Sequence, residues 1–206
     1  MTRLSASGNL LAIGYSSGTI IVIDLDTSTM IQDEENESRM VFNTVHKFSF
    51  HRSGVSTILF DQQNTQLFSG GLDTSIIIYD LVSDSASFKL LGHKEEIVKL
   101  SVFKMHTDKQ DQTVLVSCSK DGFVKLWDLV QQYCLFTFSD PSLSRIADFV
   151  LVPSLRLVVL ANCSQQEANQ HLHVYEIVRT SLGQLEFKAH SLLKKESTAK
   201  PMELSY

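Results

Sequence analysis

The sequence is poor in the residues that shape fibrous, disordered or disulfide-stabilised proteins. Its 206 residues include only three prolines, nine glycines and three cysteines. The first two numbers exclude collagen-like and low-complexity chains. Cys118, Cys134 and Cys163 are odd in number and form no C-x-x-C pair, which argues against a disulfide framework or a cysteine-rich zinc site. We therefore expect buried, free thiols in a reducing compartment.

Positive charge and long apolar runs are also scarce. Lys and Arg number 18 against 23 Asp and Glu, so the net charge is −5. This balance weighs against a surface built to bind phosphates. No apolar run approaches the roughly 18 residues of a membrane span, and no hydrophobic leader opens the sequence. We expect a soluble intracellular chain without a membrane partner.

What the sequence does contain is a repeat of one short pattern. Four segments are β-branched runs that close on an acid: GTIIVIDL (18–25), TSIIIYDL (74–81), GFVKLWDL (122–129) and QHLHVYEI (170–177). The closing acids, Asp24, Asp80, Asp128 and Glu176, lie 56, 48 and 48 residues apart. These intervals exceed the roughly 40 to 45 residues of a propeller blade. Inserts at 33–37 (DEENE) and 104–112 account for the excess, and we interpret both as solvated loops.

Each repeat divides further into short strands. Apolar or alternating runs cover 41–50, 55–60, 66–69 and 75–79 in one unit, and 88–91, 97–103, 114–118 and 123–127 in the next. Turn residues separate the runs. No window shows a capped helical period, so the pattern predicts an all-β chain with very little helix.

One unit carries a specific family signature. The segments LGHK (91–94) and SCSKDG (117–122), followed by the Trp-Asp pair at 127–128, resemble the GH-to-WD signature of WD-repeat β-propellers. The resemblance implies about four blades of antiparallel four-stranded sheet. It also implies a structural hydrogen-bond cluster within this blade, formed by His93, Ser117, Asp121 and Trp127. Such buried donors and acceptors must satisfy one another.

The other units match the signature less well. The preceding unit has His51, Ser69 and Asp73 at the same offsets but Tyr79 in place of Trp, so the resemblance predicts a partial cluster without the indole donor. The first unit has Ser17 where the turn Asp belongs. The last unit has Asn169 at that position and lacks a GH pair near residue 141.

We interpret residues 1–206 as one partial propeller. The approximate blades are 4–50, 51–92, 93–140 and 141–190, with a weakly basic tail at 191–206. The run 9–13 resembles a second strand, so the first blade is expected to lack its innermost strand. No closing strand is evident after 190. We expect an open arc that belongs to a larger propeller, or whose ends are covered by another copy or another protein.

Within the family, one group is most similar. The segments GYSSGTI (14–20), SGGLDTSII (69–77) and LLGHK (90–94), with an FD pair at 60–61, resemble the amino-terminal propellers of tandem-propeller WD-repeat proteins in the U3 small nucleolar ribonucleoprotein. This implies a nucleolar, non-enzymatic scaffold in small-subunit ribosomal RNA processing. The implied partners are other proteins of a large ribonucleoprotein assembly, and any RNA contact is expected to be indirect or weak. A general WD-repeat adaptor of ubiquitin or signalling complexes is the alternative.

Three motifs could in principle serve catalysis or metal binding, but we interpret each as an ordinary structural feature. Residues 14–18 satisfy G-x-S-x-G, but a strand follows where a nucleophile elbow needs a helix, so Ser16 is not expected to be catalytic. His171 and His173 share one strand face without a third ligand, so no metal is expected. The acids at 33–37 lack the glycine turn of a calcium loop and are interpreted as a solvated insert, with docking of a basic partner as the alternative. We expect no cofactor and no small-molecule substrate.

The cluster leads to a first mutational prediction. Replacing His93 by Ala should lower the free energy of unfolding by about 1 to 3 kcal/mol, because it leaves buried Ser and Asp groups without a partner. Thermal melts measure the change. A variant that melts like the wild type would show that the cluster does not form.

Overall fold

The computed structural model describes residues 1–32, 38–105, 112–140, 145–162, 171–180 and 185–189. These residues form four antiparallel sheets of four strands each, with strand order following the chain in every sheet. The first sheet contains β1 (Thr2–Leu4), β2 (Leu10–Gly14), β3 (Ile20–Gln32) and β4 (Ser38–Phe48). The second contains β5 (Val55–Phe60), β6 (Gln66–Gly71), β7 (Ile76–Asp80) and β8 (Ser85–Leu90).

The third and fourth sheets repeat the arrangement. They consist of β9 (Ile97–Met105), β10 (Gln112–Ser119), β11 (Phe123–Asp128) and β12 (Tyr133–Ser139), and of β13 (Ile146–Val152), β14 (Leu157–Asn162), β15 (His171–Arg179) and β16 (Leu185–Ala189). One 3-10 turn, Pro153–Leu155, is the only helical element among the described residues. No described helix is long and apolar enough to cross a membrane. The all-β prediction is confirmed.

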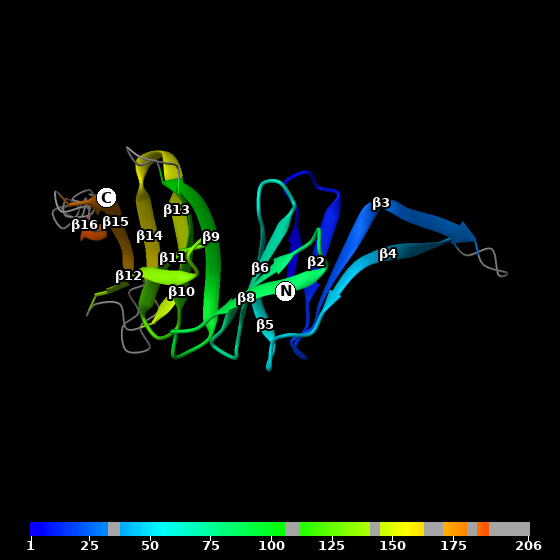
Figure 1. Ribbon diagram of the computed structural model, residues 1–206, viewed down its shortest axis with the longest axis horizontal. Helices are drawn as coiled ribbons and strands as arrows, with labels where there is room; N and C mark the ends of the chain where they lie inside the picture. Colours follow the sequence, from blue (N-terminus) through cyan, green and yellow to red (C-terminus); the bar gives the residue numbers. More distant parts are fainter. Residues whose placement is uncertain (33–37, 106–111, 141–144, 163–170, 181–184, 190–206) are drawn as a thin grey trace, which may run out of the picture.

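The sheets stack face to face in chain order, with the first and fourth at opposite ends of an arc (Figure 1). Within the described residues the arc does not close into a ring, which agrees with the predicted partial propeller. The blade limits proposed above, such as 51–92 and 93–140, stay predictions. Short segments connect successive sheets, for example the one between Phe48 at the end of β4 and Val55 at the start of β5.

The first sheet differs from the sequence-based expectation, because its innermost strand is present. β1 pairs with β2, placing Thr2 opposite Ile13 and Leu4 opposite Leu11. All three β1 residues are exposed. A strand this short, without buried residues, leaves no periodic signal to detect.

Each pair of neighbouring sheets encloses a separate hydrophobic cluster. Phe48 and Tyr79 stack between the first and second sheets, with ring centroids 4.5 Å apart. Trp127 belongs to the cluster between the second and third sheets. Phe138 and Phe187 stack between the third and fourth sheets, with ring centroids 4.7 Å apart. Burial of such apolar area is the main favourable term in folding.

The hairpin of β3 and β4 is much longer than the others and projects from the arc as a two-stranded ribbon (Figure 1). Met30 pairs with Met40 in this ribbon, and both side chains are exposed. The acidic insert 33–37, which we predicted to be a solvated loop, lies outside the described residues.

The acids that close three of the repeats have a common structural role. Asp24, Asp80 and Asp128 each accept a hydrogen bond from the backbone N–H two residues further on, at 2.9, 2.8 and 2.7 Å. Each also accepts one from the N–H three residues on. At Asp80 and Asp128, which end β7 and β11, a carboxylate that satisfies two turn amides fixes the hairpin after the third strand of the sheet. At Asp24, which lies within β3, the same hydrogen bonds accompany the shift in register between Asp24 and Thr29.

Candidate functional site

The third sheet brings together the four residues that the signature predicted. His93 lies in the connection that precedes β9, Ser117 is on β10, Asp121 is in the turn after β10, and Trp127 is on β11. The Ser117 hydroxyl Oγ lies 2.8 Å from His93 Nε2 and 2.8 Å from Trp127 Nε1. Ser117 is fully buried, and His93 and Trp127 nearly so. Three chain segments thus meet at one hydroxyl.

Asp121 completes this cluster from the turn. One carboxylate oxygen lies 3.1 Å from His93 Nδ1 and accepts the Lys94 backbone N–H at 2.8 Å. The other accepts the Phe123 N–H at 3.0 Å. Burial by itself raises the pKa of this carboxyl, but the hydrogen bonds from His93, Lys94 and Phe123 outweigh it and lower the pKa to about 2. Asp121 is therefore ionised at neutral pH.

The hydrogen-bond pattern assigns the protons of this cluster. The Trp127 indole can only donate, so Ser117 accepts from it and donates its own hydrogen to His93 Nε2. His93 then carries its proton on Nδ1 and donates it to Asp121. Every polar atom of the cluster has a partner, and each group donates a hydrogen bond to the next, from the Trp127 indole to the Asp121 carboxylate. Such a connected, buried network rigidifies the strands that it joins.

The second sheet contains an equivalent cluster. His51 Nε2 lies 2.6 Å from Ser69 Oγ, and His51 Nδ1 lies 2.9 Å from Asp73 Oδ1. Tyr79 occupies the place of Trp127, and its hydroxyl lies 3.2 Å from Ser69 Oγ. This unit has no indole, as its sequence shows, but the Tyr79 phenol reaches the same serine.

Ser75 is a member of the second cluster that the sequence did not reveal. Its hydroxyl donates to Asp73 Oδ1 at 2.6 Å, and the side chain is fully buried. Burial raises the pKa of Asp73, but hydrogen bonds from Ser75, the Arg52 backbone and His51 outweigh it and hold the pKa well below the usual range. Burial is the main reason that the pKa of His51 is lowered, although Asp73 opposes that shift. A neutral imidazole beside an ionised carboxylate results.

The Tyr79 hydroxyl offers a direct test of this second cluster. Burial raises its pKa to about 12, so it remains a neutral phenol. Replacing Tyr79 by Phe should lower the free energy of unfolding by about 1 kcal/mol, because Ser69 loses a buried partner while the ring packing stays. Urea unfolding measures the change. Tyr133→Phe, on an exposed tyrosine, is the control; equal stability losses for the two variants would contradict the assignment.

A glycine is required next to this cluster. A Cβ on Gly71 would lie 2.5 Å from both His51 Nδ1 and Asp73 Oδ1. Neither ring nor carboxylate can move without breaking its hydrogen bonds. Only glycine therefore lets β6 approach the cluster this closely.

The first and fourth sheets lack such a cluster within the described residues. Ser17 donates to the Thr19 hydroxyl at 3.1 Å in an exposed turn and contacts no histidine there. Asn169 lies outside the described residues. In the fourth sheet Tyr175 donates instead to Asp140 at 2.8 Å.

The motifs considered for catalysis or metal binding occupy ordinary structural positions. Ser16 lies in the turn between β2 and β3, and Gly18 in that turn has φ +86°, so the segment is a hairpin and not a nucleophile elbow. His173 lies on β15, and the His171 side chain is outside the described part of the chain. The described residues hold no group of three His, Cys, Asp or Glu able to bind a metal. Burial raises the pKa of the Cys118 thiol, which is therefore an unreactive core residue.

A cleft of about 590 Å³ opens between the second and third sheets. Leu59, Phe68 and Val102 contribute to its apolar lining, and Asp61 and Lys104 add charged groups. The Asp61 carboxylate is already used, because it accepts the backbone N–H groups at positions 65 and 66, each within 2.9 Å. The cleft offers apolar contact area and no constellation of reactive groups.

Comparison with known proteins places this architecture in a family. The family model described as "Nucleolar protein 10-like, N-terminal domain", a β-propeller, matches residues 1–175. Periodic tryptophan protein 2 of Saccharomyces cerevisiae is 28% identical over 130 residues, which cover 63% of this chain and 12% of that protein. COMPASS component SWD3 of the same yeast is 28% identical over 98 residues, covering 48% and 30%. Human DDB1- and CUL4-associated factor 5 is 32% identical over 79 residues, covering 38% and 8%.

The chain thus spans less than a third of the length of each of these relatives. Nothing in the described residues or in these relatives indicates a catalytic activity. The family match covers both hydrogen-bond clusters and the repeat that contains them. The chain belongs to the family of nucleolar protein 10-like N-terminal β-propeller domains, with WD-repeat proteins as its relatives.

Proposed function

We propose that the chain is a non-enzymatic WD-repeat scaffold of the nucleolus that acts in the U3 small nucleolar ribonucleoprotein during small-subunit ribosomal RNA processing. The observation that carries the proposal is the family match over residues 1–175, because the family description is nucleolar. The resemblance of segments such as GYSSGTI (14–20) to U3-particle propellers supports it. Fold alone would not assign this role.

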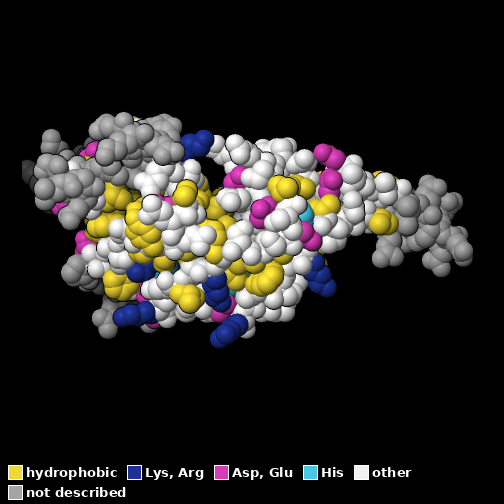
Figure 2. Space-filling view, viewed as in Figure 1, with side chains coloured by type: hydrophobic (Ala, Val, Ile, Leu, Met, Phe, Trp, Pro, Cys, Tyr) yellow, Lys and Arg dark blue, Asp and Glu magenta, His cyan; other side chains and the backbone are white. Residues whose placement is uncertain are grey.

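The structure fits a scaffold better than a catalyst. The buried polar side chains of the two clusters are already hydrogen-bonded within the protein, as Ser117 and Asp121 are to His93. What the molecule presents to partners is turns, sheet edges and apolar surface. On the face shown in Figure 2, Lys and Arg side chains are scattered and hydrophobic side chains lie between them. We therefore propose protein partners, with RNA contact indirect or weak.

Particle fractionation tests this function. A tagged full-length chain, expressed in cells of the organism it comes from, should sediment with pre-ribosomal particles, and U3 RNA should co-purify with it. Cells depleted of the chain should accumulate unprocessed small-subunit precursor RNA. Ultraviolet crosslinking should attach little RNA to the chain itself. Recovery with large-subunit particles only, or normal precursor processing after depletion, would contradict the proposal.

A general WD-repeat adaptor is the second candidate. It is favoured by the similarity to DDB1- and CUL4-associated factor 5, whose name places that protein with a cullin. It is also favoured by a zebrafish protein named p21-activated protein kinase-interacting protein 1-like, 37% identical over 67 residues. Co-purification with a ligase or kinase, in place of U3-particle proteins, would support it.

The absence of enzymatic activity has its own test. A serine-reactive fluorophosphonate probe should leave Ser16 unlabelled, because the turn at 15–18 provides no base and no helix to activate it. Labelling at Ser16 would contradict the scaffold proposal.

A further inference from the structure

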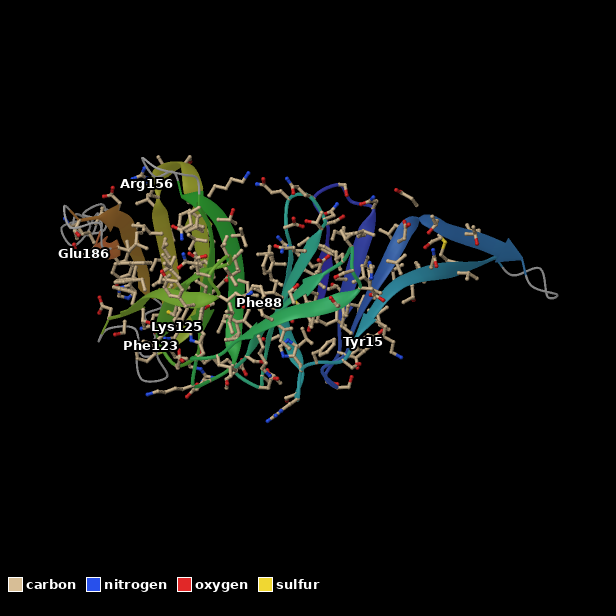
Figure 3. The ribbon with its side chains drawn as sticks, in the orientation of Figure 1. Tyr15, Phe88, Phe123, Lys125, Arg156 and Glu186 are labelled. Atoms are coloured by element: carbon tan, nitrogen blue, oxygen red, sulfur yellow. The ribbon has the colours of Figure 1, made fainter. Side chains whose placement is uncertain are left out.

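Three large apolar side chains are exposed on neighbouring turns of the first two sheets. Tyr15 lies in the turn between β2 and β3, Phe50 in the connection from β4 to β5, and Leu72 in the turn between β6 and β7. Their exposed fractions are 43%, 52% and 47%. Figure 3 shows Tyr15 at the lower edge of the arc. We call these three residues the turn patch.

The segments that carry the turn patch are in contact with one another. The Leu72 N–H donates to the Gly54 carbonyl at 2.8 Å, and the Val55 N–H donates to the Tyr15 carbonyl at 3.0 Å. The Leu72 side chain lies against Gly54, because a Cβ at that glycine would be 3.1 Å from Leu72 Cδ1 and 3.2 Å from Ser16 Cα. Segments far apart in the sequence thus form one surface.

The hydrogen-bond cluster of the second sheet holds this surface in place. Asp73, next to Leu72, lies 2.9 Å from Nδ1 of His51, which is next to Phe50. The Phe50 ring also lies near Tyr79 of the cluster, with ring centroids 6.1 Å apart. Side chains on a fixed backbone lose less conformational entropy when they bind a partner.

The composition of the turn patch is that of a binding surface. Turns are ordinarily formed by small and polar residues, whose side chains hydrogen-bond the nearby backbone. Contiguous exposed apolar side chains mark sites of interaction. Aromatic residues and arginine also dominate the binding energy of protein interfaces, and Arg52 lies two residues from Phe50.

The charged groups around the turn patch favour an acidic partner. Arg52 is exposed, and its contact with Asp73 uses the backbone N–H. Lys89 Nζ lies 3.7 Å from Asp73 Oδ2, and its side chain is partly exposed. Asp73 is the one acid among the described residues of these turns, and its side chain is almost fully buried. The exposed charge here is therefore positive, although the chain as a whole carries −5.

The next connection along this edge, between β8 and β9, is balanced in charge. Lys94 and Glu95 are both exposed, and the Glu96 carboxylate forms an ion pair with Lys120. These acids therefore do not offset the positive charge at the turn patch. Figure 2 shows Lys and Arg side chains next to hydrophobic side chains along the lower edge.

We propose that the turn patch binds an acidic segment of a partner protein. Aromatic or aliphatic side chains of that segment contact the patch, and adjacent carboxylates pair with Arg52 and Lys89. RNA fits less well, because only two cations flank the patch and phosphate binding depends on clustered Lys and Arg. The inference names a class of partner for the proposed scaffold, and it rests on that function only in taking the partner to be a protein.

Selection of short random peptides displayed on phage, against the immobilised full chain, tests the proposal. Enriched peptides should combine a net negative charge with aromatic or aliphatic residues. Fluorescence anisotropy of the most enriched peptide then measures its affinity. Arg52→Glu should weaken binding about tenfold because it reverses the charge beside the patch, and Leu72→Ser about tenfold because it removes apolar contact area.

Matched controls place the same changes elsewhere on the surface. Lys104→Glu alters the net charge by the same amount near the end of β9, and Val82→Ser removes a highly exposed apolar side chain from the turn after β7. Both should bind the peptide like the wild type. A second peptide, with Lys in place of its acids, should bind Arg52→Glu more tightly than the wild type, which a misfolded variant could not do.

Three results would overturn the proposal: no enrichment, enriched peptides without excess negative charge, or equal peptide affinities of the wild type and Leu72→Ser. A labelled single-stranded RNA oligonucleotide that binds the wild type but not Arg52→Glu would also overturn it, because the patch would then be a nucleic-acid surface. The selection uses the purified chain. Peptide binding without recovery of U3 RNA from cells would therefore contradict the proposed function and leave this inference standing.

Discussion

Replacing Asp121 by Ala is expected to lower the free energy of unfolding by about 3 kcal/mol. The carboxylate accepts hydrogen bonds from His93 Nδ1 and from the backbone N–H groups of Lys94 and Phe123. Truncation leaves these donors without a partner next to a buried imidazole, and hydrogen bonds to a charged group are among the strongest in proteins. Urea unfolding followed by tryptophan fluorescence measures the loss, because Trp127 is the only tryptophan and lies in the cluster.

Two variants control this experiment. Asp84→Ala removes a carboxylate that is 63% exposed and pairs with His46, so it should cost less than about 1 kcal/mol. Asp121→Asn keeps a hydrogen-bond acceptor but loses the charge, so its loss of stability should lie between those of Asp121→Ala and Asp84→Ala. If Asp121→Ala and Asp84→Ala cost the same, the buried cluster does not stabilise the third sheet.

The second large effect is a loss of stability in acid. The pKa values of Asp73 and Asp121 are both lowered in the folded state. Such groups contribute stability that is complete above their unfolded pKa, near 4, and is lost as the pH falls through the folded value. After allowance for solvent screening, we expect each carboxylate to contribute about 1 kcal/mol to the free energy of unfolding at neutral pH.

His51 extends this acid sensitivity toward neutral pH. Its pKa is lowered below 6.5 in the folded state, chiefly by burial, so the unfolded chain binds the proton first. Stability should therefore begin to fall below about pH 6.5 and fall further below about pH 4. Urea midpoints at pH 7, 5.5, 4 and 3 measure the profile. Asp121→Asn should flatten its lower part; a midpoint that stays constant from pH 7 to 3 would contradict the assignment.

The third-sheet cluster was predictable because the WD-repeat signature that this unit resembles names all four residue types at these offsets. The structure brings His93, Ser117, Asp121 and Trp127 together. The four sheets were predictable for a similar reason. Apolar runs such as IIIYD (76–80) recur at nearly constant spacing and are buried on both faces.

The second-sheet cluster was only partly predictable. The family signature names an indole, so it gave no reason to count the Tyr79 hydroxyl, which needs three-dimensional proximity to Ser69 to be recognised. Ser75 was missed because a serine that opens a strand is indistinguishable in sequence from a turn residue. Its role as a hydrogen-bond donor in the cluster depends on the distance of 2.6 Å between Ser75 Oγ and Asp73 Oδ1.

Local elements without apolar periodicity could not be predicted from the sequence either. β1 is three exposed residues whose pairing depends on β2. The outer end of the ribbon, where Met30 pairs with Met40 and Ile31 with Arg39, lies outside every predicted run, and the Met30 and Met40 side chains are exposed. The repeated acids were recognised as markers, but their hydrogen bonds to turn amides, as at Asp80, required the structure.

The central claim is that the buried hydrogen-bond cluster acts as one unit that holds the third sheet. A double-mutant cycle between His93→Ala and Asp121→Ala tests it most directly, because the two side chains are 3.1 Å apart and share the cluster. We expect the double variant to lose at least about 1 kcal/mol less than the sum of the two single losses, since each replacement already breaks the shared contact. Losses that add within about 0.3 kcal/mol would contradict the claim.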